Sequence, residues 1–273
     1  MLGFFMKKGG STVDLYLQKK SALILASSQG LGKAIAEELV KEGANVMLAA
    51  RSEEKLVAVQ KELSKIGKGK VSYKVTDITK PDDIKSLVEK VAEEFGGLDI
   101  LINNAGGPPG GTFNDFSDAD WQHSFELNLL SFIRTIRESL PLLKKQGGKI
   151  VNIASSSIKE PIPGLLLSNT FRTAIVGLAK TLATELAPDK ILINTVGPGR
   201  IATERIQHLD QFNAEKQGVS TADITGKALS NIPLGRYGEP EEFAKFVTFL
   251  VSGANTYLTG QSYLVDGGMV KSI

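Results

Sequence analysis

The stretch Leu23-Ile-Leu-Ala-Ser-Ser-Gln-Gly-Leu-Gly32 runs from a short apolar segment directly into a helix-forming segment, Lys33–Lys41. Glycines at such a junction let the backbone approach a diphosphate closely, and the free N–H groups at the start of a helix attract its negative charge. The same glycines could serve only the packing of the helix on the strand. The stretch by itself therefore leaves both a nucleotide site and a purely structural turn open.

Outward from this turn, short β-rich apolar runs alternate with longer segments of helical period, which is typical of a parallel sheet covered on both faces. The predicted strands are Ala22–Ala26, Asn45–Ala49, Lys70–Lys74, Ile100–Asn103, Lys149–Ile153, Leu192–Val196 and Ser262–Val265. The predicted helices are Gly32–Glu42, Glu53–Ile66, Pro81–Phe95, Asp118–Lys145, Leu166–Leu186 and Glu239–Val251. We expect an α/β fold with a doubly wound parallel sheet (Rossmann fold), three layers α/β/α, in a single domain over residues 13–273. Residues 1–12 are expected to form a flexible N-terminal extension.

One long stretch, roughly Arg200–Tyr237, carries no strong strand signal and is interrupted by Gly218, Gly226, Pro233 and Gly235. An irregular stretch of this length is more often functional than a simple linker. We predict a substrate lid over about residues 200–237, and a partly disordered surface loop is the alternative.

Composition excludes several function classes. The 32 Lys and Arg residues nearly balance 30 Asp and Glu, so no bulk charge favours nucleic acid or an anionic membrane. The absence of cysteine removes disulfides, thiolate metal sites and cysteine nucleophiles, and two histidines make a multi-histidine metal site improbable. The longest charge-free stretch, Phe246–Val265, contains too many polar residues for a membrane span. A cytoplasmic protein without a metal is expected.

Several motifs together resemble the short-chain dehydrogenase/reductase family. The family's glycine motif T-G-x-x-x-G-[I/L]-G falls on Leu25–Gly32, where Gly30, Leu31 and Gly32 match but Ala26 replaces the first glycine. Further similar elements are Asp77, Asn103–Gly106 (N-N-A-G), Pro198–Thr203 (P-G-x-x-x-T) and Gly260–Gly268. The resemblance covers about residues 13–270 and implies a dinucleotide cofactor. The cofactor-binding residues that it implies are Ser27, Gln29, Gly30, Leu31, Gly32, Arg51, Ser52, Asp77, Ile78, Asn104, Ala105, Gly106, Arg172, Pro198, Gly199, Ile201 and Thr203.

The end of the second predicted strand bears on the choice of nucleotide. A carboxylate at this place accepts hydrogen bonds from the ribose hydroxyls of NAD and repels a 2′-phosphate. Here the residues are Ala50, Arg51 and Ser52, and a guanidinium with a hydroxyl suits a phosphate. We expect NADP(H), with NAD(H) possible if Arg51 is only a solvated residue that pairs with Glu54.

The catalytic residues that the resemblance implies are only partly present. The family uses a Tyr as proton donor, a Lys four residues later, a Ser beside the carbonyl and an Asn that supports a water; the last two fall on Ser155 and Asn128. The Tyr and Lys positions hold Ser168 and Arg172, and none of the five tyrosines lies on this helix. An aliphatic hydroxyl is far less acidic than a phenol, so the usual proton donor is missing.

Other side chains could take over part of this role. Lys159 or Glu160, in the loop after Ser155, could act as an acid or a base if desolvated, although an exposed pair is the simpler interpretation. His208 in the lid region is a weaker candidate, and His123 is expected to face solvent or a partner.

These observations lead to two hypotheses. The first is an atypical NADP(H)-dependent oxidoreductase, similar to 3-oxoacyl-[acyl-carrier-protein] reductases, that moves hydride between nicotinamide and a small carbonyl or alcohol. The second is a catalytically weak dinucleotide-binding protein that acts as a sensor or scaffold. The segments Asp118–Lys145 and Leu166–Leu186 carry apolar residues around more of their circumference than one sheet face can cover, so a homotetramer or dimer is expected.

Overall fold

The computed structural model describes residues 14–272 and contains a seven-stranded sheet in which every neighbouring pair of strands is parallel. The strand order is β3-β2-β1-β4-β5-β6-β7. The strands are β1 (Ser21–Leu25), β2 (Asn45–Ala50), β3 (Val71–Val75), β4 (Ile100–Asn103), β5 (Gly148–Ile153), β6 (Ile191–Pro198) and β7 (Ser262–Val265). Each predicted strand is present, with ends shifted by two residues at most. The predicted extension 1–12 lies outside the described residues.

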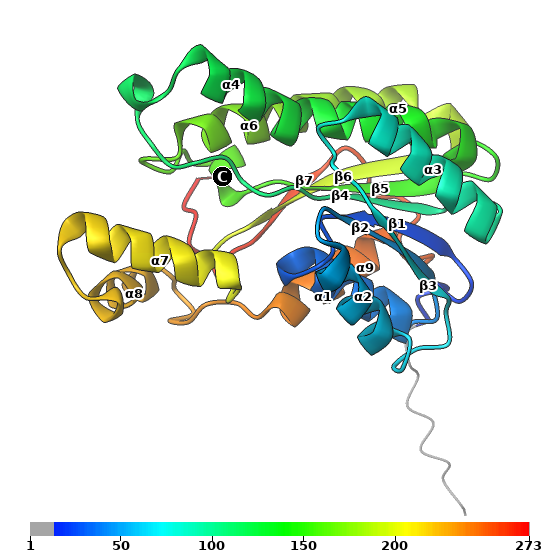
Figure 1. Cartoon of the computed structure of the whole chain (residues 1–273), viewed down its shortest axis with the longest axis horizontal. Helices are drawn as coiled ribbons and strands as arrows, with labels where there is room; N and C mark the ends of the chain where they lie inside the picture. The colour runs from blue at the N-terminus through cyan, green and yellow to red at the C-terminus, as the bar shows by residue number, and fades with distance from the viewer. Residues whose placement is uncertain (1–13, 273) are drawn as a thin grey trace, which may run out of the picture.

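Helices cover both faces of this sheet, which confirms the predicted three-layer doubly wound fold (Figure 1). One face carries α1 (Gly30–Lys41), α2 (Glu53–Leu63) and α9 (Pro240–Val251). The other face carries α3 (Pro81–Phe95), α5 (Ser131–Leu143) and α6 (Leu166–Glu185), with α4 (Asp118–Phe125) leading into α5. Within residues 14–272, none of the helices is both long and apolar enough to cross a membrane.

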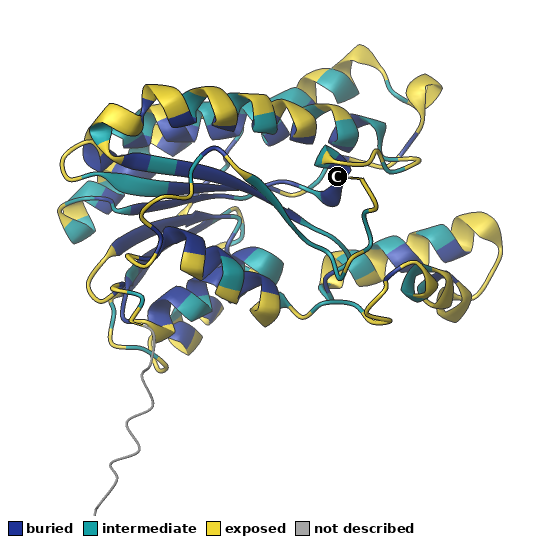
Figure 2. Ribbon diagram, turned by 180° about the vertical axis from the view of Figure 1, so that it is seen from behind, coloured by how far each residue is buried: buried dark blue, intermediate teal, exposed yellow. Residues whose placement is uncertain are grey.

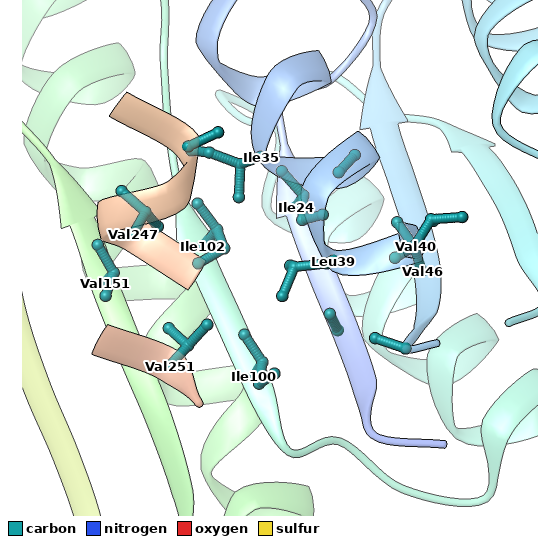
Figure 3. Packing of buried hydrophobic residues seen from close by; sticks show 14 of the residues in the cluster. Ile24, Ile35, Leu39, Val40, Val46, Ile100, Ile102, Val151, Val247 and Val251 are labelled. Carbon is teal, nitrogen blue, oxygen red and sulfur yellow. The ribbon is translucent and has the colours of Figure 1, made fainter. Parts of the chain in front are cut away.

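The core consists of two apolar clusters, one on each side of the sheet. Successive side chains of a strand point to opposite faces, so Leu23 joins one cluster and Ile24 the other. Figure 3 shows the cluster that contains Ile24, in which Ile35 of α1 lies beside Val247 of α9. Strands buried on both faces explain why the sequence shows nearly continuous apolar runs rather than alternation.

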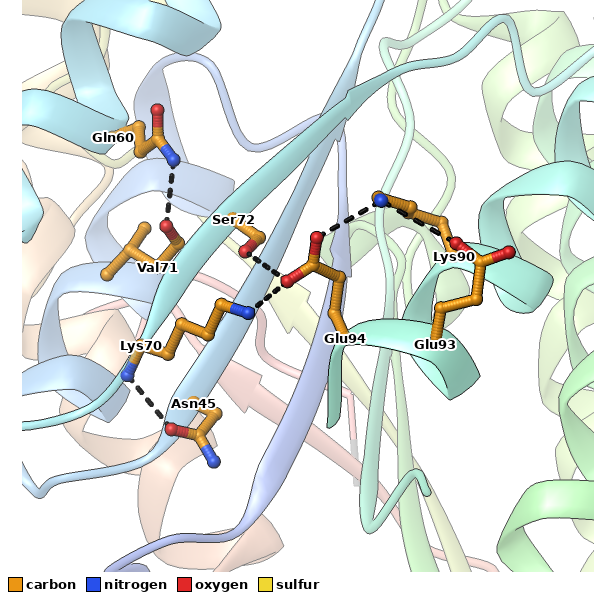
Figure 4. A network of polar contacts seen from close by, with 8 residues as sticks. All are labelled: Asn45, Gln60, Lys70, Val71, Ser72, Lys90, Glu93 and Glu94. Carbon is orange, nitrogen blue, oxygen red and sulfur yellow. Dashed lines mark hydrogen bonds and ion pairs between the residues drawn. The ribbon is translucent and has the colours of Figure 1, made fainter. Parts of the chain in front are cut away.

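A polar network ties β3 to α3 at the edge of the sheet (Figure 4). The Glu94 carboxylate accepts hydrogen bonds from Lys70 and from the Ser72 hydroxyl, and it pairs with Lys90 at 3.1 Å. Hydrogen bonds from Lys70 and Lys90 and their positive charges lower the pKa of Glu94 from 4.5 to about 2. The carboxylate is therefore stabilised in its ionised form by the fold.

This network predicts an acid-dependent loss of stability. Because the pKa of Glu94 is lower in the folded chain, its contribution is complete above about pH 4.5 and is lost as the pH falls toward 2. Between pH 6 and pH 3 the free energy of unfolding should fall more for the wild type than for Glu94→Gln, as measured by urea denaturation. An equal fall in both proteins would contradict this assignment.

The stretch predicted to be irregular, Arg200–Tyr237, is helical, and this part of the prediction was wrong. It contains α7 (Glu204–Gln217) and α8 (Thr221–Ser230). Most side chains of both helices are exposed, and the buried ones are Asp210, Ala214 and Ile224, so no apolar stripe marks the helices in the sequence (Figure 2). A Ser220–Asp223 capping box begins α8.

The predicted helix Asp118–Lys145 is also interrupted. A π-helical turn, Glu126–Leu130, separates α4 from α5. Such turns insert one extra residue into the helix and occur often at functional sites. Asn128, one of the predicted catalytic residues, lies in this turn and is fully buried.

Candidate active site

A cavity of about 980 Å³ opens at the carboxyl ends of the strands. It lies where the strand order reverses between β1 and β4, the place where doubly wound sheets bind ligands. Its lining comes from the segments that follow all seven strands, together with residues of α7 and of the end of α8. The topology therefore brings segments that are far apart in the sequence to one site.

The glycine turn before α1 forms one wall of this cavity. Gly30 has a φ of +57°, and a Cβ there would meet only a methyl of Thr203 at 3.8 Å, so the turn faces open space. The first turn of α1 contains no acidic residue, and Gln29 makes no side-chain cap. Its free N–H groups can therefore bind an anion. Gly32 has a different role, because a Cβ there would lie 2.4 Å from the Ala26 carbonyl oxygen, which makes Gly32 a packing residue.

Ala26, which replaces the first glycine of the motif, has a φ of +47°. A Cβ in this left-handed region costs roughly 1–2 kcal/mol, while glycine adopts it freely. Ala26→Gly should therefore raise the free energy of unfolding by about 1 kcal/mol, after allowance for the greater flexibility of glycine in the unfolded chain. Chemical denaturation measures this. Ala36→Gly, in the buried interior of α1, is the control and should destabilise the protein.

Cationic and polar groups gather at the end of β2. Arg51, Ser52 and Lys55 line the cavity, and the Lys55 ammonium donates to the Gln29 side-chain oxygen at 2.5 Å. Within residues 14–272 Arg51 forms no ion pair with Glu54 or any other carboxylate. Lys55 was missed from the sequence, although its position one helical turn after Arg51 could have indicated it.

Asp77, after β3, is held by its neighbours in the ionised state. It accepts hydrogen bonds from the Thr79 N–H at 3.0 Å and from the Thr79 hydroxyl at 2.7 Å. Desolvation raises the pKa of Asp77. The two hydrogen bonds from Thr79 and the charges of Lys80 and Arg51 outweigh it, so the pKa lies below its usual value. The carboxylate is thus a fixed acceptor at this end of the cavity.

Most of the predicted cofactor residues line the cavity. They are Gln29, Gly30, Leu31, Arg51, Ser52, Asp77, Ile78, Asn104, Ala105, Gly106, Arg172, Pro198, Gly199, Ile201 and Thr203. Ser27 and Gly32 do not line it. The Ser27 hydroxyl is buried, donates to the Ile24 carbonyl and accepts from the Ala49 N–H, so it links β1 to β2 instead.

Ser155, Ser168 and Arg172 meet at the other end of the cavity. The Ser155 hydroxyl accepts a hydrogen bond from the Ser157 N–H at 3.1 Å, which fixes its oxygen. Arg172 is only 4% exposed, and its guanidinium donates to the carbonyl oxygens of Ile153 at 2.7 Å and Ala105 at 3.0 Å. Burial, together with the charge of Arg205, lowers the pKa of Arg172 to about 10.

The other predicted candidates either lie outside the cavity lining or border it as exposed residues. Asn128 is buried behind it and donates to the Ser124 carbonyl at 3.3 Å. Lys159 and His208 are exposed and do not line the cavity. Glu160 and His123 do border it, and both are exposed.

The described part of the cavity wall contains no tyrosine. Tyr237, in the segment before α9, donates instead to the buried Asp210 carboxylate at 2.7 Å. Arg200 and Arg205 also line the cavity and were not predicted as site residues. Arg200 lies inside the Pro198–Thr203 element, which could have indicated it, whereas no sequence signal marks Arg205, which the packing of α7 brings to the cavity. Within residues 14–272, no cluster of three or more His, Asp or Glu side chains is placed to hold a metal.

Comparisons with known proteins agree with this geometry. Residues 25–270 match the family model described as enoyl-(acyl carrier protein) reductase. The chain is 34% identical to the uncharacterized oxidoreductase YvrD of Bacillus subtilis, over 96% of this chain and 100% of that protein. It is 35% identical to the 3-oxoacyl-[acyl-carrier-protein] reductase FabG of Thermotoga maritima, over 93% of this chain and 99% of that protein.

Among solved structures, L-sorbose reductase from Gluconobacter frateurii, in complex with NADPH and L-sorbose, is similar over the whole fold. The TM-score is 0.91 at 33% identity, covering 96% of this chain and 100% of that one. The sequence match, the strand order and the cavity at the switch point all agree with one family. The chain belongs to the short-chain dehydrogenase/reductase family of oxidoreductases.

Proposed function

We propose that this protein is an NADP(H)-dependent oxidoreductase that transfers hydride between nicotinamide and the carbonyl or alcohol group of a small molecule. The observation that carries the proposal is a single cavity joining the glycine turn of α1, the cations after β2 and Ser155 after β5. The NADPH bound by L-sorbose reductase, a relative of the same fold, supports the choice of cofactor.

The residues present fit a dinucleotide phosphate. Gly30 leaves open space beside the N-terminus of α1, and a Cβ at Gly106 would meet nothing within 4 Å, so backbone borders the cavity at both places. Arg51, Ser52 and Lys55 would hold a 2′-phosphate through charge-assisted hydrogen bonds. Bound NADPH supplies the hydride, while the protein supplies position and electrostatics.

The chemistry left to the protein is stabilisation and protonation of the oxygen that gains charge. The Ser155 hydroxyl donates a hydrogen bond to that oxygen, and the buried Arg172 guanidinium provides a positive field beside it. Ser168 lines the same end of the cavity but is too weak an acid to replace a phenol. Water that enters the open cavity delivers the proton, so turnover is slower than with a tyrosine.

A second candidate function is that of a nucleotide sensor or scaffold. The observation that favours it is the pair Ser168 and Arg172 at the positions of the family's Tyr and Lys. Titration of the purified protein with NADPH and NADH, followed by NADPH oxidation against a panel of aldehydes, ketones and oxo acids, separates the two. Tight NADPH binding with measurable oxidation supports the enzyme. Tight binding without any oxidation supports the sensor, and no binding of either nucleotide defeats both.

We also propose that the chain is a homotetramer or dimer. Trp121 and Phe125 of α4 pack against Phe171 of α6, with ring centroids 5.8 and 6.1 Å apart, and all three rings remain partly exposed. Partly exposed aromatic groups of this kind are usually covered by a symmetric partner. Light scattering at micromolar concentration should give a mass at least twice 29.3 kDa. A monomer mass would contradict the proposal.

A further inference from the structure

Two arginines line the cavity beside the segment that follows β4, and neither has a carboxylate partner. Arg172 is nearly inaccessible and bonds only to two backbone carbonyls. Arg205, in the first turn of α7, lies with its guanidinium nitrogen 3.5 Å from the Gly107 carbonyl oxygen. Among residues 14–272, no carboxylate lies within 4.0 Å of either guanidinium. Arg205 is an exposed residue, so water reaches one of these two like charges, but neither has a carboxylate partner.

The two guanidinium groups contact one short segment of backbone. Arg172 bonds the carbonyl of Ala105 and Arg205 approaches the carbonyl of Gly107, two residues later. A Cβ at Gly107 would lie 2.2 Å from the Arg205 Nη2, so this side chain rests directly on the glycine backbone. The two charges are close enough for Arg205 to contribute to the lowered pKa of Arg172. An anion beside them would relieve this repulsion.

The other charged groups of the cavity do not supply that anion. Arg200 is neutralised by Asp210, while Arg51, Lys55 and Asp77 belong to the end of the cavity after β2 and β3. Glu160 is exposed, and its carboxylate accepts from the Lys271 N–H at 3.4 Å. The remaining lining groups that can carry charge are the exposed Glu204, Lys271 and His123.

We propose that Arg205, with Arg172 beside it, binds the carboxylate of an anionic substrate, so that the substrate is an oxo acid or the corresponding hydroxy acid. The inference rests on the proposed oxidoreductase function and names its substrate class. Arg172 bonds the carbonyl of Ile153, which lies two residues before Ser155. Two peptide units separate these residues, so their Cα atoms are at most ~7.6 Å apart. Arg172 thus places the fixed charge beside the segment that carries Ser155, so a carboxylate bound next to it belongs to the same molecule as the reacting carbonyl.

Arg172 uses two hydrogen bonds to hold the segments after β4 and β5 in place, whereas Arg205 makes a single long bond and comes from α7. Arg205 is therefore the residue that can reorient toward a ligand, and Arg172 is the fixed charge. This difference makes Arg205 the position to change in a test, since its substitution removes no buried hydrogen bond from the core.

The test compares matched acids and esters by calorimetric titration of the protein alone and of the protein with NADP⁺, which has no hydride to transfer to them. The probes are 2-oxobutanoate, acetoacetate and their methyl esters. At least one acid should bind about tenfold or more tightly than its ester, because a charge-assisted pair contributes roughly that much. Arg205→Gln should weaken binding of that acid by about tenfold to a hundredfold and leave the ester within a factor of about two. Arg205→Lys should restore part of the affinity for the acid.

Lys216→Gln is the matched control, because it removes one positive charge from the same helix at an exposed position that does not line the cavity. It should leave the binding of all four probes unchanged. Three results would overturn the inference. The wild type binds acids and esters equally, Arg205→Gln loses the same affinity for both, or the wild type binds neither acid. NADPH affinity, measured separately, tests the proposed function. If the protein does not bind NADPH but still binds the acid in a way that depends on Arg205, the proposed function is rejected and the carboxylate site is retained.

Discussion

Ser155→Ala is expected to lower kcat/KM for a responsive carbonyl substrate by about 10²–10³-fold, the usual effect of removing one donor to a developing oxyanion. Ser168→Ala should lower it only a few-fold. The reason for the contrast is chemical. Both hydroxyls line the same end of the cavity, but neither is acidic enough to deliver the proton. Only Ser155 has its oxygen fixed by a backbone N–H, from Ser157, at 3.1 Å.

The comparison requires that each variant still binds NADPH with the wild-type affinity, so nucleotide titration accompanies the kinetics. Ser157→Ala is the matched control. It keeps the backbone N–H that holds Ser155, and its side chain is buried and does not line the cavity. A thousandfold loss in Ser168→Ala with nucleotide binding intact would show that Ser168 acts on the substrate proton and would refute the proposed chemistry.

The second large effect concerns the nucleotide. Wild-type protein should bind NADPH more tightly than NADH, and Arg51→Ala should weaken NADPH binding by about tenfold to a hundredfold, since a charge-assisted pair to phosphate contributes roughly 1.5–3 kcal/mol. NADH binding should stay nearly unchanged because that nucleotide lacks the 2′-phosphate. Fluorescence titration of both nucleotides against both proteins measures the difference.

Lys55→Gln sharpens this test. Lys55 lines the cavity beside Arg51 but already bonds Gln29, so its loss should weaken NADPH binding less than the loss of Arg51 does. Lys61→Gln, also on α2 but exposed and outside the cavity lining, should have no effect. Equal affinities of the wild type for NADPH and NADH would refute the assignment of Arg51 and Lys55 to a phosphate.

Sequence patterns were sufficient to predict the strands of the sheet and most of the helices that cover it. Strands such as Ile100–Asn103 and helices such as Pro81–Phe95 have the predicted bounds because burial on one or both faces leaves an apolar pattern in the sequence. The helices α7 and α8 were missed for the converse reason. Their side chains are mostly exposed, so no apolar stripe indicates a helix. Only local backbone preference and, for α8, a capping box indicate one.

The sequence by itself determined the parallel sheet, the glycine turn before α1, the cationic end of β2 and the absence of a tyrosine at position 168, because each depends on a local motif or on residue identity alone. Only the tertiary structure decided that Gly32 packs against Ala26, that Ala26 adopts a positive φ, and that Arg172 bonds the segments after β4 and β5. The same holds for Arg205, which reaches the cavity through the packing of α7. Contacts between residues far apart in the chain leave no local pattern, so the place of Arg205 beside Gly107 becomes visible only in the folded molecule.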